Sequence, residues 1–446
     1  MANKSFLDIV KRTHGDGNYT GDQHGGAAGS SGSGLPDGSA RNFLFATGIE
    51  CSYPTIQNGA IRRDQLEECF HYKYWRRDLE LVKDLGLKVL RYGLPYYKIH
   101  LAPGKYDWSF ADEVMGEINK MGITPILDLL HFGVPNWLEN FQNPEIPIHF
   151  ADYAKAVATR YPWVRYYTPI NEIYVTAKMS AKDGIWNEQL KSDKGFVTAI
   201  KHLVAASILA TQSIASCRPD AIIVQSESAE YMHEARAIPS NEVRLANKQR
   251  LISFDLLYAC PPDADVCIYM MDNGLTREEY DWFMAGEPPG YQVMGNDYYG
   301  RNERIMKPDG SICTAEDVMG WYQITHAYYK RYKKPVMHTE TNTFDPEQAP
   351  TWLWKQWINI LKMRAEGVPV LGFTWYSLTD QVDWDCGLAE KRGIVNACGL
   401  FDLDRNPRPV ADAYKMLLKE YGQITIFPHG DLFEITRQEA RLKIEV

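Results

Sequence analysis

Eight short apolar segments alternate with amphipathic segments between Arg41 and Tyr421, and this alternation constrains the fold more than any other feature of the chain. A short apolar run is typical of a strand that is buried on both faces, whereas apolar residues at helical spacing predict a helix. Strands and helices that alternate in this way form parallel β-α units. The sequence therefore predicts an α/β fold, a single (β/α)8 TIM barrel over residues 41–421.

The expected strands are Phe43–Ile49, Lys88–Tyr92, Ile123–His131, Val164–Asn171, Ala221–Ser226, Tyr291–Tyr299, Pro335–Thr339 and Val368–Ser377. The expected helices are Tyr74–Leu85, Phe110–Met121, His149–Arg160, Phe196–Ser216, Arg244–Leu257, Ala315–Tyr332, Pro350–Glu366 and Val410–Tyr421. No glycine-rich dinucleotide motif follows the first strand, which argues against an open doubly wound sheet. A closed barrel is the favoured architecture.

The two ends of the chain differ from the barrel in composition. Residues 15–40 are rich in Gly and Ser, so this stretch buries too little apolar surface to offset the entropy of ordering it. We expect residues 1–40 to be a flexible leader and residues 422–446 to be a short C-terminal extension. The start of the chain lacks the apolar region of a signal peptide, and no long apolar run predicts a membrane span. A cytoplasmic location is therefore expected.

The net charge and the cysteine spacing indicate which macromolecular partners, metals and cofactors to expect. The formal net charge of −9 argues against nucleic acid and against an anionic membrane as partners. The cysteines form no C-x-x-C pair, and neither a Cys/His cluster with zinc spacing nor an H-E-x-x-H motif occurs in the sequence. We therefore expect no metal and no cofactor. The sequence leaves open whether the chain forms a homo-oligomer.

Polar side chains stand where the expected strands end, and in a TIM barrel these carboxyl ends build the active site. The residues at those ends are Glu50, Arg91, His131, Asn171, Glu172, Glu227, Asn296, Tyr298, His338, Glu340 and Trp375. Hydrolysis of a glycosidic bond needs one carboxyl group that protonates the leaving oxygen and one carboxylate at the anomeric carbon. This set of side chains suits that chemistry, although Glu227 and His338 receive no role.

Six segments also resemble, in order and spacing, glycoside hydrolase family 1, the β-glucosidase type. They are FHYKYWRRDLELVKDLGLKVLRYGLPYYKI (70–99), GITPILDLLHFGVPNWL (122–138), YYTPINEIYV (166–175), GNDYYGRN (295–302), VMHTETNTF (336–344) and GFTWYSLTDQVDW (372–384). The resemblance implies a retaining mechanism with Glu172 as general acid/base and Glu340 as nucleophile. It also implies that Arg91 and Tyr298 contact Glu340, keeping it ionised and oriented.

The resemblance further implies the residues that bind the sugar. Asn171 would hold the 2-hydroxyl and His131 the region of the 3-hydroxyl. Trp375 would form the floor of the subsite, with a cis peptide between Trp375 and Tyr376. The remaining expected binding residues are Glu50, Asn296, Asp383 and Trp384.

The chain departs from the family pattern in the part that reads the sugar. Pro54 stands where a Gln that binds two hydroxyls is usual, Phe132 replaces a Trp, and Asp383 replaces a longer acid. Because unmatched polar groups in a binding site shift specificity, we expect plain β-glucosidase activity to be weak or secondary. Lys391 and Arg392 leave open a charged glycone such as a 6-phosphosugar or a uronic acid.

The sequence thus predicts a retaining β-glycosidase that acts on a small-molecule or oligosaccharide glycoside by double displacement. Two alternatives stay open. A transglycosylase on the same site would be distinguished by its products in the presence of added sugar acceptors. A non-catalytic carbohydrate-binding barrel would leave any measured turnover unchanged when Glu340 is replaced.

Overall fold

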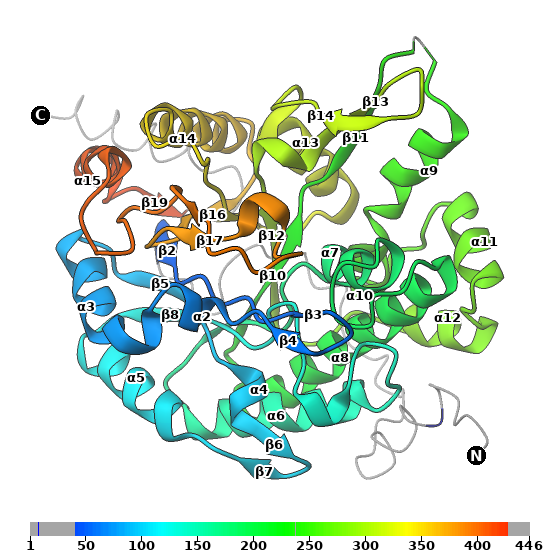
Figure 1. Ribbon diagram of the computed structural model, residues 1–446, viewed down its shortest axis with the longest axis horizontal. Coiled ribbons are helices and arrows are strands. Elements are labelled where there is room, and N and C mark those ends of the chain that lie inside the picture. The colour runs from blue at the N-terminus through cyan, green and yellow to red at the C-terminus, as the bar shows by residue number, and fades with distance from the viewer. Residues whose placement is uncertain (1–7, 9–40, 237, 427–446) are drawn as a thin grey trace, which may run out of the picture.

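The computed structural model describes residues 8, 41–236 and 238–426, and its centre is a closed barrel of eight parallel strands (Figure 1). Neighbouring strands in the barrel follow sequence order, and the last pairs with the first. The barrel strands are β2 (Leu44–Gly48), β5 (Val89–Gly93), β8 (Thr124–Asp128), β9 (Tyr166–Thr168), β10 (Ile222–Ser228), β12 (Tyr291–Asp297), β15 (Val336–Glu340) and β16 (Val370–Tyr376). Each overlaps one expected strand, so the predicted (β/α)8 barrel is confirmed.

Helices surround the barrel and cover its outer face (Figure 1). In chain order they are α2 (Gln65–Glu68), α3 (His71–Asp84), α4 (Tyr96–Ile99), α5 (Ser109–Lys120), α6 (Ile146–Arg160), α7 (Ile173–Ala177), α8 (Asp193–Cys217), α9 (Asn241–Gln249), α10 (Ile252–Leu257), α11 (Ala264–Asp272), α12 (Arg277–Phe283), α13 (Gly320–Tyr332), α14 (Ala349–Ala365) and α15 (Pro409–Tyr421). Helix α3 ends as its sequence predicts, because Gly86 has φ +83° and this left-handed conformation stops a helix.

Small sheets lie outside the barrel. The two-stranded ones are β1 (Arg41–Asn42) with β19 (Thr425–Ile426), β3 (Thr55–Ile56) with β4 (Ile61–Arg62), β6 (His100–Ala102) with β7 (Lys105–Tyr106), and β17 (Gln381–Val382) with β18 (Val395–Asn396). A three-stranded sheet joins β11 (Tyr231–Glu234), β13 (Glu303–Met306) and β14 (Ile312–Thr314). It stands beside α9 at one side of the molecule (Figure 1), and it forms one wall of a cavity described below.

The predicted leader and most of the predicted C-terminal extension lie outside the described residues. Within the described part, β19 pairs antiparallel with β1. The chain after α15 therefore returns to the segment that enters the barrel. Nothing in the described range tests whether residues 1–40 are flexible.

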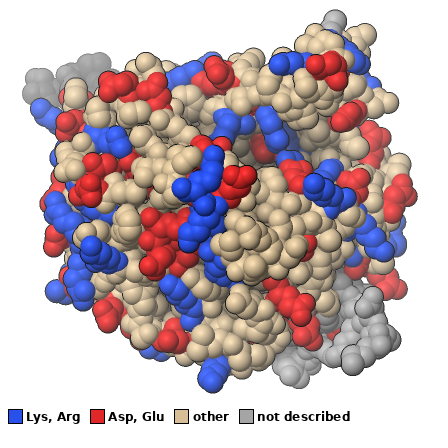
Figure 2. All heavy atoms as spheres, viewed as in Figure 1, with Lys and Arg blue, Asp and Glu red and all other residues tan. Residues whose placement is uncertain are grey.

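The barrel strands are buried over most or all of their length, as their near-continuous apolar sequences require. Helix α8 is long and apolar enough to cross a membrane by length and composition, but 83% of its most apolar 18-residue window is buried inside the fold. Packing against α6, α7 and α10 accounts for that apolar surface. On the molecular surface, acidic and basic side chains are interspersed over the face shown in Figure 2.

Two helix predictions differ from the structure. The segment Arg244–Leu257 forms two helices, α9 and α10, with a break at Arg250 and Leu251. The segment Ala315–Tyr332 becomes helical only at Gly320, because Glu316 and Asp317 have positive φ angles that a right-handed helix excludes. Helices α11 and α12 were not expected.

Candidate active site

A cavity of about 310 Å³ opens at the carboxyl ends of the barrel strands, and we call it the central cavity. Its volume lies at the lower end of the range of small-molecule sites, about 300–1,000 Å³. Five of the expected site residues line it: Glu50, His131, Glu172, Glu340 and Trp384. The aromatic and apolar lining includes Phe132, Met179, Ile185 and Trp186. The cavity thus combines apolar walls with acidic groups and with the cations Lys178, Arg301 and Arg304.

Glu340 is the last residue of β15, and its side chain is 4% exposed. Arg91, from the middle of β5, donates from Nη1 to Glu340 Oε1. The hydroxyl of Tyr299 donates to Glu340 Oε2 at 2.7 Å. Hydrogen bonds from a cation and a hydroxyl fix the position of the carboxyl group. The geometry therefore orients Glu340 at the edge of the cavity.

Glu172 lies directly before α7, with φ +39°. A non-glycine residue with this left-handed backbone is strained by roughly 1–2 kcal/mol, and such strain is concentrated at functional sites. The side chain is 7% exposed. Burial, and then the negative charges of Asp297 and Glu340, raise the pKa of Glu172 well above its ordinary value. A carboxyl group that stays protonated in a cavity can act as a general acid.

Asp297 is a third carboxyl group in this region, and the sequence analysis did not select it. It is the last residue of β12, and the strand register places it opposite Glu340 on β15. Its side chain is fully buried; Oδ2 accepts from Ser226 Oγ at 2.6 Å, whereas Oδ1 has no hydrogen-bond partner among the described residues. Burial, and then the charge of Glu340, raise the pKa of Asp297 well above its usual range.

Arg91 also connects Glu340 to the residues expected to bind the sugar. Its Nη2 donates to Asn171 Oδ1 at 2.5 Å and to Asp128 Oδ2 at 2.8 Å. Since a guanidinium only donates, the amide oxygen of Asn171 must face Arg91, and its Nδ2 then faces His131 Nε2 at 3.1 Å. In the neutral form of His131, Nε2 is therefore the acceptor and Nδ1 carries the proton that it donates to Asp128 at 2.8 Å. Burial lowers the pKa of His131, but Cys51 and Asp128 outweigh it and raise that pKa well above its ordinary value.

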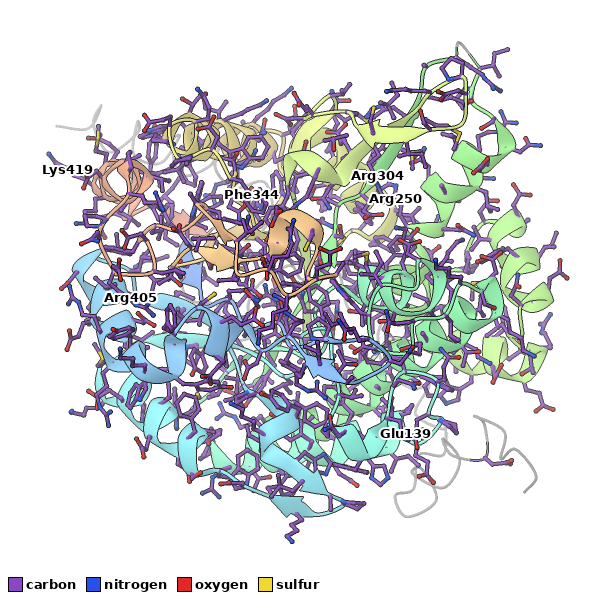
Figure 3. The ribbon with its side chains drawn as sticks, viewed as in Figure 1. Glu139, Arg250, Arg304, Phe344, Arg405 and Lys419 are labelled. Carbon is purple, nitrogen blue, oxygen red and sulfur yellow. The ribbon has the colours of Figure 1, made fainter. Side chains whose placement is uncertain are left out.

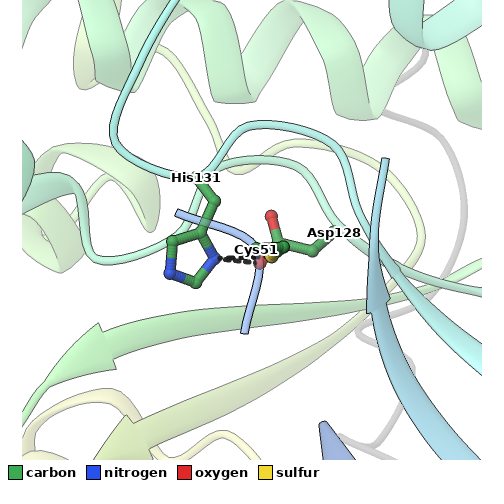
Figure 4. Close-up of side chains that lie close together, drawn as sticks. All are labelled: Cys51, Asp128 and His131. Carbon is green, nitrogen blue, oxygen red and sulfur yellow. Dashed lines mark hydrogen bonds and ion pairs between the residues drawn. The ribbon is translucent and has the colours of Figure 1, made fainter. Parts of the chain in front are cut away.

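Cys51, Asp128 and His131 form a compact buried cluster behind the cavity (Figure 4). Cys51 Sγ lies 3.4 Å from His131 Nδ1, the same ring nitrogen that donates to Asp128. A divalent cation held by these three residues would face Arg91, because the guanidinium already donates to Asp128 Oδ2, and the two positive charges would repel each other. The contacts fit a hydrogen-bonded group that orients His131 better than they fit a metal site.

Comparison with known proteins identifies the family. The model of glycosyl hydrolase family 1 matches residues 52–259. The aryl-phospho-beta-D-glucosidase BglA of Bacillus subtilis is 32% identical in an alignment of 386 residues that covers 72% of this chain and 79% of that protein. The chain belongs to glycosyl hydrolase family 1.

Two further proteins are similar to this chain at lower identity. The chloroplastic galactolipid galactosyltransferase SFR2 of Arabidopsis thaliana is 21% identical over 387 residues. The match covers 79% of this chain but only 58% of that protein, so the chain spans little more than half the length of this relative. The solved family 1 beta-glucosidase from Thermotoga maritima superposes with a TM-score of 0.72 at 19% identity, covering 86% of this chain and 99% of that one. This likeness confirms the β-glucosidase-like barrel.

The structure corrects the position of the family 1 tyrosine motif by one residue. The side chain of Tyr298 does not contact the carboxyl group of Glu340, although the Tyr298 backbone N–H donates to the Glu340 carbonyl at 2.9 Å. The Tyr298 hydroxyl instead lies 2.7 Å from both Glu303 Oε1 and Asp317 Oδ1. Tyr299 makes the expected contact instead. Asn296 likewise is fully buried outside the lining of the central cavity. The physical reason is the alternation of side chains along a strand, which turns a one-residue error in alignment into a change of face.

The same shift occurs in β16. The cis peptide lies between Tyr376 and Ser377, not between Trp375 and Tyr376. Trp375 is fully buried and donates from Nε1 to the carbonyl of Cys398, so it does not form the floor of the central cavity. The ring of Tyr376 stacks on His131 at a centroid distance of 6.2 Å and lies under the guanidinium of Arg91. Tyr376, and not Trp375, therefore packs against His131 and Arg91, although Tyr376 is not among the residues that line the central cavity.

Asp383 has a different environment from the one predicted. Its carboxylate pairs with Arg63 at 2.9 Å and accepts from the backbone N–H groups of Arg392, Gly393 and Ile394. These contacts occupy both oxygens, so Asp383 organises the loop after β17 and is not free to read a sugar hydroxyl. Glu50, in contrast, lines the central cavity, and Gln381 Nε2 donates to it at 3.1 Å.

Four other residues that the sequence singled out lie outside the lining of the central cavity. Glu227 accepts from the backbone of Tyr174 and Ser228, and burial raises its pKa to about 7. His338 stacks on Trp321, and burial lowers its pKa to about 3. Arg392 pairs with Asp385, and Lys391 is largely exposed. The residues that line the central cavity include neither Lys391 nor Arg392.

The paired tyrosines provide a matched test of the Glu340 environment. Tyr299→Phe is expected to lower kcat/KM on a nitrophenyl glycoside by about 10- to 100-fold, because it removes a hydrogen bond to a charged group. Tyr298→Phe should leave kcat/KM within a factor of about 3, since its hydroxyl bonds only outside the cavity. Steady-state kinetics of the two variants measure this difference, and equal losses would contradict the assignment of Tyr299.

Proposed function

We propose that the protein is a retaining β-glycosidase with a glycone pocket that differs from those of plain β-glucosidases. One observation carries the proposal: Glu172, which follows β9, and Glu340, at the end of β15, line the same cavity from different strands and have contrasting surroundings. Glu340 is paired with Arg91, whereas burial and neighbouring carboxylates favour the protonated form of Glu172. Such a pair divides the roles of nucleophile and acid.

The two carboxyl groups act in two steps. In the first, Glu340 attacks the anomeric carbon while Glu172 transfers its proton to the leaving oxygen, and a covalent glycosyl-enzyme forms. In the second, Glu172 removes a proton from water, which displaces Glu340 and gives a product with the original anomeric configuration. This mechanism predicts a separation of about 5–5.5 Å between the two carboxyl groups.

Proton NMR of the first-formed sugar tests the mechanism directly. A panel of nitrophenyl β-glycosides, including galactosides, fucosides, xylosides and phosphosugars, first identifies the glycone that is cleaved fastest. We expect the β-anomer of that sugar to appear before mutarotation produces the α-anomer. An initial α-anomer would show inversion and overturn the two-step mechanism.

Asp297 should set the pH range in which Glu172 works. Glu172 must be protonated in the first step, so kcat/KM falls as pH rises through its pKa. An ionised Asp297 raises that pKa, just as burial and Glu340 raise the pKa of Asp297 itself, and Asp297→Asn removes the ionisable group while keeping the shape. We expect the basic limb of the kcat/KM profile to move to lower pH in this variant. An unmoved or upward-shifted limb would contradict the coupling.

Transfer to an acceptor is a second candidate function, because one relative is a galactosyltransferase. A glycosyl-enzyme on Glu340 can react with a sugar hydroxyl in place of water, so both functions share the first step. Product analysis with and without an added sugar acceptor distinguishes them. A predominance of oligosaccharide products at low acceptor concentration would favour transfer over hydrolysis.

A further inference from the structure

Arg250 is a buried cation that the proposed chemistry does not use. It follows α9 directly, and its side chain is 8% exposed. Its Nε and Nη1 atoms are buried and have no hydrogen-bond partner in the described part of the chain. The guanidinium lies over the rings of Tyr231 and Tyr328, at 5.5 and 4.8 Å from their centroids. A buried guanidinium with unused donors is costly unless a ligand supplies acceptors.

Arg250 lines a second cavity, of about 190 Å³, which we call the side cavity. Arg304 lines it as well, and Figure 3 shows both arginines near the β11–β13–β14 sheet. The other charged residues of this cavity are already paired: Arg304 with Glu230 at 2.9 Å, and Lys178 with Asp183 at 2.6 Å. Arg250 has no carboxylate partner within the described residues, so the side cavity carries an uncompensated positive charge.

The side cavity adjoins the central cavity on the side of Glu172. Lys178, Asp183, Glu230 and Arg304 line both cavities. Helix α7, which begins directly after Glu172, contributes Tyr174 to the side cavity and Val175 to the central cavity. A general acid stands next to the leaving oxygen, so the group attached to that oxygen departs toward the Glu172 side.

We propose that the side cavity binds an anionic group, a carboxylate or phosphate, carried by the aglycone of the substrate. The proposal rests on the proposed glycosidase function for the direction in which the aglycone lies. The guanidinium of Arg250 supplies N–H donors to the anion, and guanidinium groups match the hydrogen-bonding geometry of carboxylates and phosphates. Tyr231 and Tyr174 flank the anion-bearing group with aromatic surface. The enzyme is thereby selective for acidic aglycones, whatever its glycone.

Binding of free aglycones tests the subsite without requiring turnover. Calorimetric titration of the protein with 4-hydroxybenzoate and with 4-hydroxybenzamide compares an anion with a neutral group of the same shape. We expect the benzoate to bind about tenfold more tightly than the benzamide, because a charge-assisted hydrogen bond is about twice as strong as a neutral one. Added salt should weaken the binding of the benzoate alone.

Two arginines on the same helical segment give a matched pair of variants. Arg250→Gln should abolish the preference for the benzoate. Arg244→Gln should retain it, because Arg244 is exposed and does not line the side cavity. Equal binding of both compounds by the wild-type protein, or a preference that survives in Arg250→Gln, overturns the proposal. The salt titration needs no variant, so it decides the matter even when Arg250→Gln does not fold.

Rates of turnover show whether the anion site or the glycosidase function fails. The ratio of kcat/KM for 4-carboxyphenyl and 4-carbamoylphenyl β-glycosides should favour the acidic aglycone about tenfold in the wild type, and the preference should disappear in Arg250→Gln. A failure to cleave either glycoside, together with selective binding of the benzoate, would contradict the glycosidase function and still support the anion site. Cleavage of both glycosides at equal rates would contradict the anion site alone.

Discussion

Replacing Glu340 by Gln is expected to lower kcat on every aryl glycoside by at least about 10⁴-fold, because the variant has no nucleophile for the first step. The amide keeps the size of the side chain, so Tyr299 Oη can still donate to its oxygen, whereas Arg91 loses one of its two anionic partners and keeps Asp128. Stopped assays with a sensitive fluorogenic glycoside measure the residual rate. Circular dichroism establishes that the barrel remains folded.

Glu227→Gln is the matched control for this substitution. Glu227 is also a buried glutamate near the end of a barrel strand, but its carboxylate bonds to backbone N–H groups and does not line the central cavity. An amide oxygen can accept the same bonds, so we expect a loss of less than about tenfold. Comparable losses in the two variants would show that any buried glutamate at the mouth is needed, and that Glu340 has no special role.

Chemical rescue distinguishes a missing nucleophile from a distorted site. Glu340→Gly should regain activity when azide or formate is added, because a small anion can occupy the space of the carboxylate and attack the anomeric carbon. The attack then produces an α-glycosyl product. A β-glycosyl product, or no rescue in a folded variant, would contradict the assignment of the nucleophile.

Glu172→Ala is expected to have an effect that depends on the leaving group. Glycosides with poor leaving groups should lose about 10²- to 10⁴-fold in kcat/KM, since general acid catalysis contributes about this much. A dinitrophenyl glycoside should lose much less in kcat/KM, because its leaving group departs without protonation. The basic limb of the pH profile should also disappear, as the group whose raised pKa produces it is absent.

The second step of the mechanism gives an independent test of the role of Glu172 as a general base. Without Glu172 no base activates water. The glycosyl-enzyme should therefore accumulate while the variant turns over the dinitrophenyl glycoside. Azide should then accelerate turnover and yield the β-glycosyl azide. A loss that is uniform across all leaving groups, with an unchanged pH profile, would show that Glu172 serves the structure only.

The fold could be predicted from the sequence because its signals are local and repeated. Each barrel strand is a short buried segment, and most helices end at glycines or charged turns, so all eight strands were located. The β11–β13–β14 sheet and the helices α11 and α12 were not predicted. These elements form between segments distant along the chain or rest on packing, and their sequences lack a strong periodic signal.

The sequence predicts the position of a site residue best where only one alignment of its motif with the strand end is possible. Glu172 and Glu340 line the central cavity and Arg91 contacts Glu340, and each of these residues stands in a segment with a single matching motif. Tyr298 and Trp375 were misplaced, because two aromatic residues stand in succession in each segment and alternate strand residues face opposite ways. A hydrophobic pattern cannot rank two adjacent aromatic residues, so only tertiary contacts distinguish them.

Asp297 and Arg250 were missed for another reason. Neither residue is unusual in the sequence, and the importance of each depends on what the fold leaves unpaired beside it. Asp297 is opposite Glu340 only because the β12–β15 register shifts between Gly295 and Asp297. Arg250 is unpaired only because Glu230 and Asp183 bond to other cations.

Trapping the covalent intermediate tests the central claim most directly. Incubation with a 2-deoxy-2-fluoro β-glycoside of the preferred sugar, bearing a dinitrophenyl leaving group, slows the second step more than the first. We expect intact-protein mass spectrometry to show one added fluoroglycosyl group and peptide mapping to place it on Glu340. Turnover of the parent substrate without any adduct, or an adduct on another residue, would contradict the account.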